Sequence, residues 1–223
     1  MSPCNSSDLE SQPLLVVISG PSGAGKDSLV NALLGREPGL RRVVTTTDRP
    51  PRPDETDGLD YHFVSTAEFE HLIAQGELVE WAIVYDQYKG IAQWELERAL
   101  ESGQDVVVRV DVQGAETIRR LMPQAILIFV AAPSEAEMIR RLRERGGDTE
   151  EQMESRIGTA REEMAHLEEF DYLVINHQGR LHEAVEQIQA ILIAEHCRIK
   201  RERRLSLTSV SSGPIIQATR AGE

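Results

Sequence analysis

A glycine-rich stretch that ends in a lysine is the first pattern in this sequence that could do chemistry. It follows a short apolar run and precedes a helical pattern. Glycines let successive backbone amides turn toward phosphate oxygens, while the helix N-terminus and the lysine ammonium add positive charge. We therefore predict a loop that binds nucleotide phosphates. Its residues are Gly20, Pro21, Ser22, Gly23, Ala24, Gly25, Lys26, Asp27 and Ser28.

The residue after the loop lysine is Asp27, where this motif usually has serine or threonine. A carboxylate beside a chain of phosphates costs roughly 4 kcal/mol per close charge pair at an effective dielectric constant of 20, and a cation between them reverses the sign. We therefore predict that Asp27, or Ser28 next to it, reaches a Mg²⁺ ion directly or through water. The alternative is that Asp27 only stabilises the first helical turn, where acids are favoured.

A second candidate phosphate site lies in the stretch 45–64. Arg49 and Arg52 are three residues apart in proline-rich, extended chain, and Glu55 and Tyr61 follow them. Two guanidinium groups held this way form a forked set of donors that suits a monophosphate. The sequence thus predicts one loop for a phosphate donor and one cluster for a phosphate acceptor.

Four short apolar runs must position these residues: 14–19, 105–110, 125–130 and 172–176. They are too short and too continuous for amphipathic helices, and helical patterns follow them, which is typical of buried parallel strands. A capping-box pattern at 134–137 and apolar spacing over 180–197 indicate two of the helices. The right-handed crossover rule places helices on both faces of the sheet. We predict an α/β core made of residues 14–42, 96–137 and 165–197.

Two insertions interrupt this core. Residues 43–95 contain strand-like pieces at 42–46, 60–64 and 78–84 around a helix capped at 65–68, and residues 138–164 are dense in arginine and glutamate. Insertions at the top of a parallel sheet commonly form ligand-binding subdomains and lids. Residues 1–13 are expected to form a disordered leader. Residues 198–223, a basic and serine-rich tail, show no apolar periodicity and are also expected to be disordered.

Composition narrows the possible partners and location. The chain of 223 residues has 24 Lys plus Arg against 37 Asp plus Glu, a net charge of −13, which repels nucleic acid and anionic membranes. Its two cysteines lie near opposite ends, with no spacing typical of disulfides or zinc. No apolar run approaches the length of a membrane span. We expect a cytoplasmic protein that binds neither nucleic acid nor membrane.

The acceptor cluster resembles that of the guanylate kinase family, whose members carry Thr-Arg, Arg, Glu, Gly, Asp-Tyr and Phe at these intervals. The resemblance covers about residues 14–197. It implies a P-loop NTPase three-layer sandwich with a parallel sheet core, an inserted GMP-binding subdomain and a small helical lid. It also implies transfer of the γ-phosphoryl of ATP to GMP, with Mg²⁺ as cofactor, by a monomer or homodimer.

The resemblance assigns roles to the acceptor residues. Arg49, Arg52 and Tyr61 would hold the GMP phosphate, a hydroxyl of Thr45 or Thr46 would address guanine O6, and Glu80 would accept hydrogen bonds from guanine N1 and its amino group. Adenine has no such donor pair, so it would leave a buried Glu80 unpaired, and sites of this kind can reject the wrong base by ~10⁴-fold. The resemblance implies further GMP-site positions at Glu55, Tyr88 and Asp111.

It also assigns roles on the donor side. Lys26, Arg141, Arg145 and Arg156 would neutralise charge on the transferred phosphoryl group, the three arginines from a mobile lid, and Asn176 would contact the adenine of ATP. An alternative for Arg141 is a surface ion pair with Glu137 worth only ~0.3 to 0.5 kcal/mol.

Three positions depart from the family pattern: Asp48 replaces threonine, Arg109 stands where relatives often have an acid, and the Tyr88-Lys89-Gly90-Ile91 run leaves open whether Tyr88 or Lys89 holds the GMP phosphate. Two other functions therefore remain alternatives. One is a ribose 1,5-bisphosphate phosphokinase, which would lack the arginine cluster and Glu80. The other is a non-catalytic guanylate-kinase-like module that binds phosphopeptides, and such modules usually lose the loop lysine.

Overall fold

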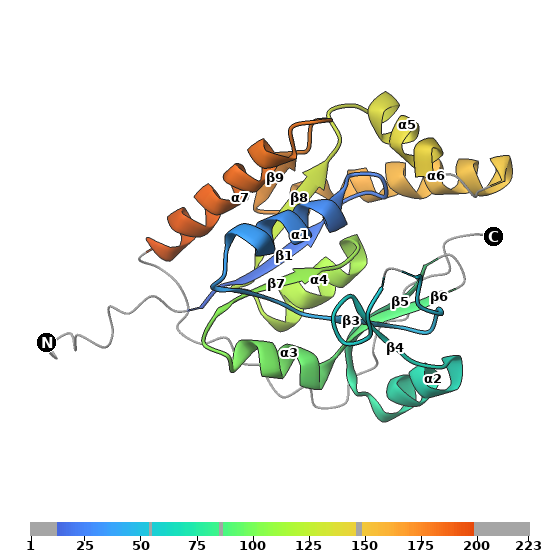
Figure 1. Ribbon diagram of the computed structural model, residues 1–223, viewed down its shortest axis with the longest axis vertical. Helices are drawn as coiled ribbons and strands as arrows, with labels where there is room; N and C mark the ends of the chain where they lie inside the picture. The colour runs from blue at the N-terminus through green and yellow to red at the C-terminus, as the bar shows by residue number, and fades with distance from the viewer. Residues whose placement is uncertain (1–12, 54, 85–86, 146–148, 199–223) are drawn as a thin grey trace, which may run out of the picture.

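A five-stranded parallel sheet forms the centre of the protein (Figure 1). The computed structural model describes residues 13–53, 55–84, 87–145 and 149–198, so almost all of the expected leader and tail lies outside the described residues. The strand order is β2-β7-β1-β8-β9. The bounds are β1 Leu15–Ser19, β2 Leu40–Arg42, β7 Asp105–Arg109, β8 Ile126–Ala131 and β9 Tyr172–Ile175. All four apolar runs predicted from the sequence are strands of this sheet.

The two faces of the central sheet are covered by different helices, which makes a three-layer α/β sandwich as predicted. Val16 and Ile18 of β1 pack with α1 (Lys26–Arg36) and α7 (Leu181–His196). Leu15 and Val17 pack on the other face with α3 (Gln93–Leu100) and α4 (Val112–Leu121). Because β1 is buried on both faces, it favours apolar side chains on both, which explains its continuous apolar run from Leu15 to Ile18.

A second sheet, β4-β3-β6-β5, lies within the expected insertion. Its strands are β3 Thr45–Thr47, β4 Tyr61–Phe63, β5 Leu78–Val84 and β6 Gln87–Ala92, and α2 (Thr66–Gln75) begins at the predicted capping box of Ser65 and Glu68. Two expectations were wrong in detail. The piece 42–46 is divided between the two sheets, since Val43 still donates to the Val107 carbonyl of the central sheet. Strand β6 was not predicted, because its first half is polar and half-buried.

Two helices form the second insertion, α5 (Glu135–Arg145) and α6 (Glu150–Ala165), followed by a 3-10 turn, η2 (His166–Glu169). They pack on each other through Met138, Leu142, Met153 and Ala160. Only half of the predicted capping box at 134–137 forms: the Glu137 amide donates to the Ser134 hydroxyl, but the Glu137 carboxylate pairs with Arg140 and Arg141. The exact limits of both insertions remain a prediction.

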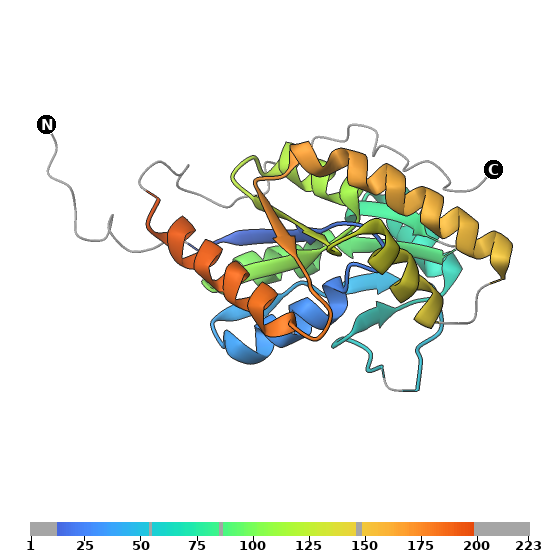
Figure 2. The same cartoon turned by 90° about the horizontal axis from the view of Figure 1, so that it is seen from above.

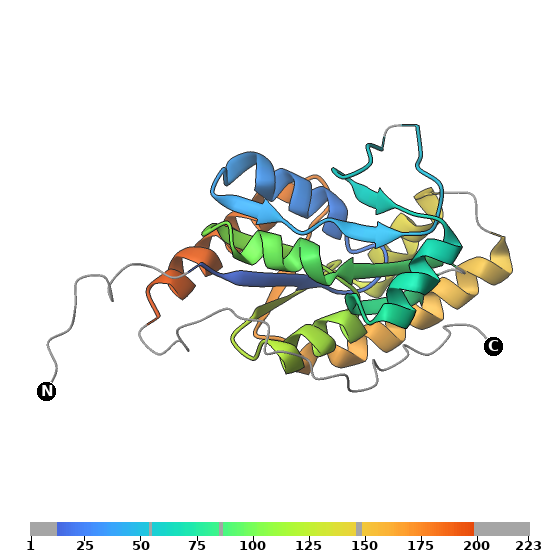
Figure 3. The same ribbon diagram turned by 90° about the horizontal axis from the view of Figure 1, so that it is seen from below.

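Both insertions flank the same end of the molecule. Figures 2 and 3 show α7 at one end and α5, α6 and the second sheet at the other, beyond the carboxyl ends of the central strands. The loop after β1 therefore lies between the two insertions. Among the described helices, none is both long and apolar enough to cross a membrane.

The second sheet depends on Phe69 of α2, a fully buried ring that stacks on Tyr88 with 4.9 Å between ring centroids. We expect Phe69→Ala to lower the free energy of unfolding by about 3 to 5 kcal/mol, because the cavity left behind adds to the lost burial. Urea denaturation measures this loss. Ile193→Ala, which shortens a side chain that is 67% exposed on α7, is the matched control and should change stability by less than about 0.5 kcal/mol.

Candidate active site

The loop between β1 and α1 is held tightly against the central sheet. Gly20, Gly23 and Gly25 have φ angles of 131°, 84° and 84°, a region that side chains rarely adopt. A Cβ atom on Gly20 would lie 2.1 Å from the Val130 carbonyl oxygen of β8, so no larger residue fits there. The Lys26 ammonium donates to the carbonyl of Gly20 and to that of Pro21, 3.1 Å away. The glycines of the motif are thus required by the backbone geometry.

Both lid helices contact this loop. A Cβ atom on Gly23 would lie 3.2 Å from Leu142 of α5, and the Ser22 amide donates to the Glu163 carboxylate of α6 over 3.1 Å. Burial raises the pKa of Glu163 above its ordinary value, and the nearby Lys26 ammonium acts in the opposite direction. An acidic side chain from the lid therefore shares the loop with the lysine, an arrangement that the sequence did not predict.

A cavity of about 240 Å³ opens beside the loop, lined in part by Gly25, Ser28, Arg141 and Asn176. The Asn176 side-chain amide donates to the Ala24 carbonyl over 2.9 Å, and Arg141 donates to the Asn176 carbonyl over 2.8 Å. Arg141 is 12% exposed and also pairs with Glu137 at 2.8 Å, so the same side chain forms the expected ion pair and lines the cavity.

The other two arginines of the second insertion, Arg145 and Arg156, are described to different extents. Arg145 is the last residue of α5, and its side chain lies outside the described residues. Arg156 is half-buried on α6, which also supplies Glu163. The predicted roles of both in phosphoryl transfer stay predictions.

On the second sheet, Thr45 and Glu80 share one face. Gly90 pairs with Thr46 on one side and with Trp81 on the other. Thr45 is the neighbour of Thr46 on β3, and Glu80 is the neighbour of Trp81 on β5, where it pairs with Ile91. Directly opposed residues point to the same face, and neighbours along a strand point to opposite faces. Of the two threonines considered for the guanine, the geometry places Thr45 with Glu80 and Thr46 on the face that α2 covers.

Glu80 is 8% exposed, and its carboxyl group lies against the first turn of α4. A Cβ atom on Gly114 would lie 3.0 Å from its Oε2, so the glycine permits this approach. Asp111 begins α4 by accepting from the Gly114 amide over 2.7 Å. Burial, with a smaller contribution from Asp111, raises the pKa of Glu80 well above its ordinary value of 4.5. A buried acid whose charge no nearby cation offsets is suited to recognise a ligand that brings its own hydrogen-bond donors.

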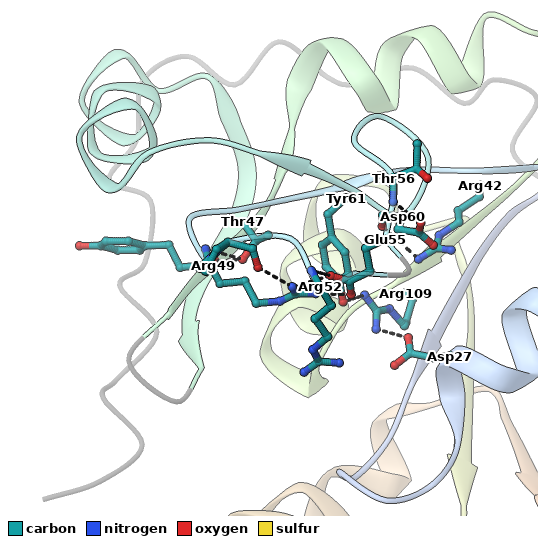
Figure 4. Close-up of polar contacts among 12 residues, drawn as sticks. Asp27, Arg42, Thr47, Arg49, Arg52, Glu55, Thr56, Asp60, Tyr61 and Arg109 are labelled. Atoms are coloured by element: carbon teal, nitrogen blue, oxygen red, sulfur yellow. Dashed lines mark hydrogen bonds and ion pairs between the residues drawn. The ribbon is translucent and has the colours of Figure 1, made fainter. Parts of the chain in front are cut away.

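The arginine cluster is preorganised by Glu55 (Figure 4). Its carboxylate receives two hydrogen bonds from the Arg49 guanidinium, at 2.5 and 2.6 Å, and one from the Arg52 amide at 2.9 Å. These bonds hold the pKa of Glu55 at about 2. The Arg49 guanidinium also lies 4.8 Å from the ring centroid of Tyr61. Arg49, Arg52, Glu55 and Tyr61 are thus brought together, whereas the Arg52 side chain stays exposed.

The structure separates Tyr88 from this cluster. The Tyr88 ring packs on Phe69 and Trp81 beneath α2, and its amide donates to Asp48 over 2.8 Å. Lys89, on the opposite face of β6, is close enough to Arg49, Tyr61 and Arg109 to interact electrostatically with them, and burial is the largest cause of its lowered pKa. Of the two residues left open by the sequence, Lys89 is the one that faces the cluster.

Arg109 joins the two predicted sites. It ends β7, one Nη forms an ion pair with Asp27 of the phosphate loop, and the other donates to the Tyr61 hydroxyl over 2.8 Å (Figure 4). The N-cap residue of α1 is Gly25, which has no side chain to accept from the free amides, and Asp27 lies in the first turn of the helix, where an acid is favoured. Neither alternative considered for Asp27 anticipated a protein cation as its partner.

Sequence reasoning therefore missed two residues of this region, Arg109 and Glu163, and left Lys89 as one of two alternatives. Arg109 and Lys89 were visible as departures from the family pattern, but nothing in the sequence showed what they contact. Glu163 is one of many acids in the lid segment and carried no distinguishing signal. In the described part of the chain, no three His, Cys, Asp or Glu side chains group closely enough to hold a metal by themselves.

Comparisons with known proteins agree with this geometry. The family model for guanylate kinase matches residues 12–195. The guanylate kinase of Desulfitobacterium hafniense is 42% identical over 85% of this chain and 94% of its own length, and that of Caldanaerobacter subterraneus is 41% identical over 89% and 96%. The crystal structure of guanylate kinase from Anaplasma phagocytophilum superposes with a TM-score of 0.69 at 30% identity, covering 85% of this chain and 89% of that one. The chain belongs to the guanylate kinase family.

Proposed function

We propose that this protein transfers the γ-phosphoryl group of ATP to GMP, giving ADP and GDP. The observation that carries the proposal is the buried Glu80 carboxyl group, which lies on the same face as Thr45 in the sheet that also contains Tyr61. A purine with donors at N1 and at its amino group satisfies this acid, while adenine would leave it unpaired. Membership of the guanylate kinase family supports the same assignment.

In this proposal the protein contributes position and charge. The acceptor is already an anionic phosphate, so no general base is required. Lys26 and the lid arginines Arg141, Arg145 and Arg156 neutralise charge on the transferred group. Arg49, Arg52, Tyr61 and Lys89 hold the acceptor phosphate, and Thr45 addresses guanine O6. The cavity beside Asn176 receives the adenosine of ATP.

Mg²⁺ is the cofactor that we propose for ATP. Carboxylate and hydroxyl oxygens suit this ion, which keeps several waters and is bound chiefly through one or two protein groups and the nucleotide phosphates. Ser28 and Asp27 fit that pattern, with Asp111, the N-cap residue of α4, as a water-mediated contact. Because Arg109 already neutralises Asp27, the charge argument for direct metal binding by Asp27 weakens, and the Ser28 hydroxyl becomes the better candidate. Bound Mg²⁺ would offset the negative charge of the phosphates.

Two alternatives receive less support. A ribose 1,5-bisphosphate phosphokinase has no use for a buried acid that reads a base edge. A non-catalytic phosphopeptide module has no use for Lys26, which here donates within the phosphate loop. For localisation we propose the cytoplasm, consistent with the free, exposed thiol of Cys197. A monomeric or homodimeric state, without nucleic acid or membrane partners, also stays a prediction.

The direct test is an ADP-release assay with ATP, Mg²⁺ and each phosphate acceptor in turn. We expect GMP to be the best acceptor and dGMP the next, because both carry the guanine edge that Glu80 reads. Faster turnover with AMP, UMP or ribose 1,5-bisphosphate would contradict the proposal.

Glu80→Gln should lower the selectivity for guanine and raise the stability of the folded protein. The raised pKa means that the folded protein holds a proton that the unfolded chain releases near pH 4.5, so Glu80 costs stability increasingly as pH rises above 4.5 toward its folded pKa. We expect the variant to be more stable than the parent by a margin that grows over this range, measured by thermal unfolding, and to discriminate GMP from AMP much less well.

The same shift predicts proton release when GMP binds. Glu80 must be ionised to accept from guanine, so GMP affinity should rise with pH through the folded pKa, and calorimetry in buffers of different ionisation enthalpy should detect the released proton. Glu80→Gln should abolish that release. Equal proton release in both proteins would show that Glu80 does not contact the base.

Lys89→Ala and Tyr88→Phe distinguish the two residues left open by the sequence. Removing the Lys89 ammonium should raise the GMP KM by about tenfold, since a charged hydrogen bond contributes ~1.5 to 3 kcal/mol. Tyr88→Phe keeps the ring that packs on Phe69, so its GMP KM should stay within about twofold. The reverse order of effects would mean that Tyr88 turns toward the acceptor.

A further inference from the structure

Arg109 lies where two phosphate sites meet, although neither proposed site includes it. Its side chain is 15% exposed, and it comes from the carboxyl end of β7 rather than from either insertion. One Nη pairs with Asp27, and the other donates to Tyr61 Oη. The guanidinium carbon also lies 5.5 Å from the Tyr61 ring centroid. A planar fork of donors can hold two partners in a fixed relation in this way.

The surroundings explain why Arg109 needs Asp27. Lys26, Arg42 and Lys89 all interact electrostatically with Arg109, and in each case its charge contributes to a lowered pKa, after burial as the largest cause. Asp27 has the opposite effect on all three. The carboxylate therefore offsets repulsion among these cations and holds the guanidinium in place. Asp27, which departs from the usual phosphate-loop motif, and Arg109, which departs from the family pattern, form a single ion pair.

The contact with Tyr61 has a chemical consequence. Because Arg109 has no acceptor, the Tyr61 hydroxyl oxygen must receive that hydrogen bond, which leaves the phenolic proton available to another acceptor. Burial acts to raise the pKa of Tyr61, but the charge of Arg109 and its hydrogen bond help to bring it below the ordinary value of 10.0. A more acidic hydroxyl is a stronger hydrogen-bond donor.

We propose that Arg109 is a positioning residue for the acceptor phosphate: anchored by Asp27 of the phosphate loop, it fixes the Tyr61 hydroxyl so that its proton is donated to that phosphate. The proposal rests on GMP as the acceptor. It also links the loop that binds the donor nucleotide to a residue that holds the acceptor. An ion pair within the protein thereby fixes the position of the acceptor phosphate relative to the phosphates of the donor nucleotide.

The test is calorimetric titration of GMP, without ATP or Mg²⁺, into the full-length protein and its variants. We expect Arg109→Gln and Tyr61→Phe each to weaken GMP binding by about tenfold, or ~1.4 kcal/mol. The double variant should be no more than about twofold weaker than Tyr61→Phe alone, because Arg109 acts through the hydroxyl that Tyr61→Phe removes. Additive losses would mean that Arg109 contacts the phosphate itself and would overturn the proposal.

A second double-mutant cycle, between Arg109 and Asp27, distinguishes positioning of Tyr61 from repulsion between Asp27 and the GMP phosphate. If Arg109→Gln weakened binding only by exposing the Asp27 charge to the GMP phosphate, then adding Asp27→Asn would restore affinity, and the proposal would be wrong. We expect no restoration. Arg109→Lys retains the charge but not the fork, so it should keep the melting temperature and still bind GMP several times more weakly. Wild-type affinity in Arg109→Lys would also contradict the inference.

The matched control is Arg119→Gln. Arg119 is a partly exposed arginine of α4 that pairs with Asp171, and its removal should leave GMP affinity unchanged. A loss as large as that of Arg109→Gln would mean that net charge is responsible, which would overturn the inference.

If the unaltered protein does not bind GMP, both the proposed function and this inference fail. If it binds GMP and Arg109→Gln binds equally well, only the inference fails.

Discussion

Burial of β1 on both faces is the constraint on which the rest of the structure depends. With apolar side chains packed against α1 and α7 on one side and α3 and α4 on the other, the strand has no room for polar groups until it ends. The chain must then turn sharply, and the glycine at that turn contacts the Val130 backbone too closely for any side chain. The backbone amides that suit phosphate are gathered at this turn, at the edge where the neighbouring strands also end.

The two insertions place different side chains near that edge of the central sheet. The second sheet carries Glu80 and Thr45, the residues proposed to recognise the base, and is stabilised on its other face by Phe69 and α2. The lid supplies Arg141 beside Asn176 and places Glu163 against the loop. Each insertion has its own small apolar cluster. Their functional side chains can therefore be held in position without interrupting the core of the central sheet.

Several charges within the site are offset by local pairing, whereas burial of the Glu80 carboxyl group is not offset by a nearby cation. Glu55 compensates Arg49, and Asp27 compensates Arg109. Glu80 instead meets another acid, Asp111, which adds to the effect of burial on its pKa. A buried acid without a compensating cation destabilises the folded protein above the pH at which the free acid ionises. Such a loss of stability is expected at a binding site, where the ligand supplies the hydrogen-bond donors that the buried acid lacks.

The sequence by itself determined the α/β core, the phosphate loop and the family. These depend on local patterns: continuous apolar runs, glycines at fixed spacing, and arginines in proline-rich chain. Only the tertiary structure could separate Thr45 from Thr46 and Lys89 from Tyr88, because strand register decides which of two neighbours faces the site. Only the tertiary structure could reveal the Asp27–Arg109 pair, since its members are 82 residues apart and meet because β7 lies beside β1. Contacts across parallel strands follow from the order of those strands, which no local pattern encodes.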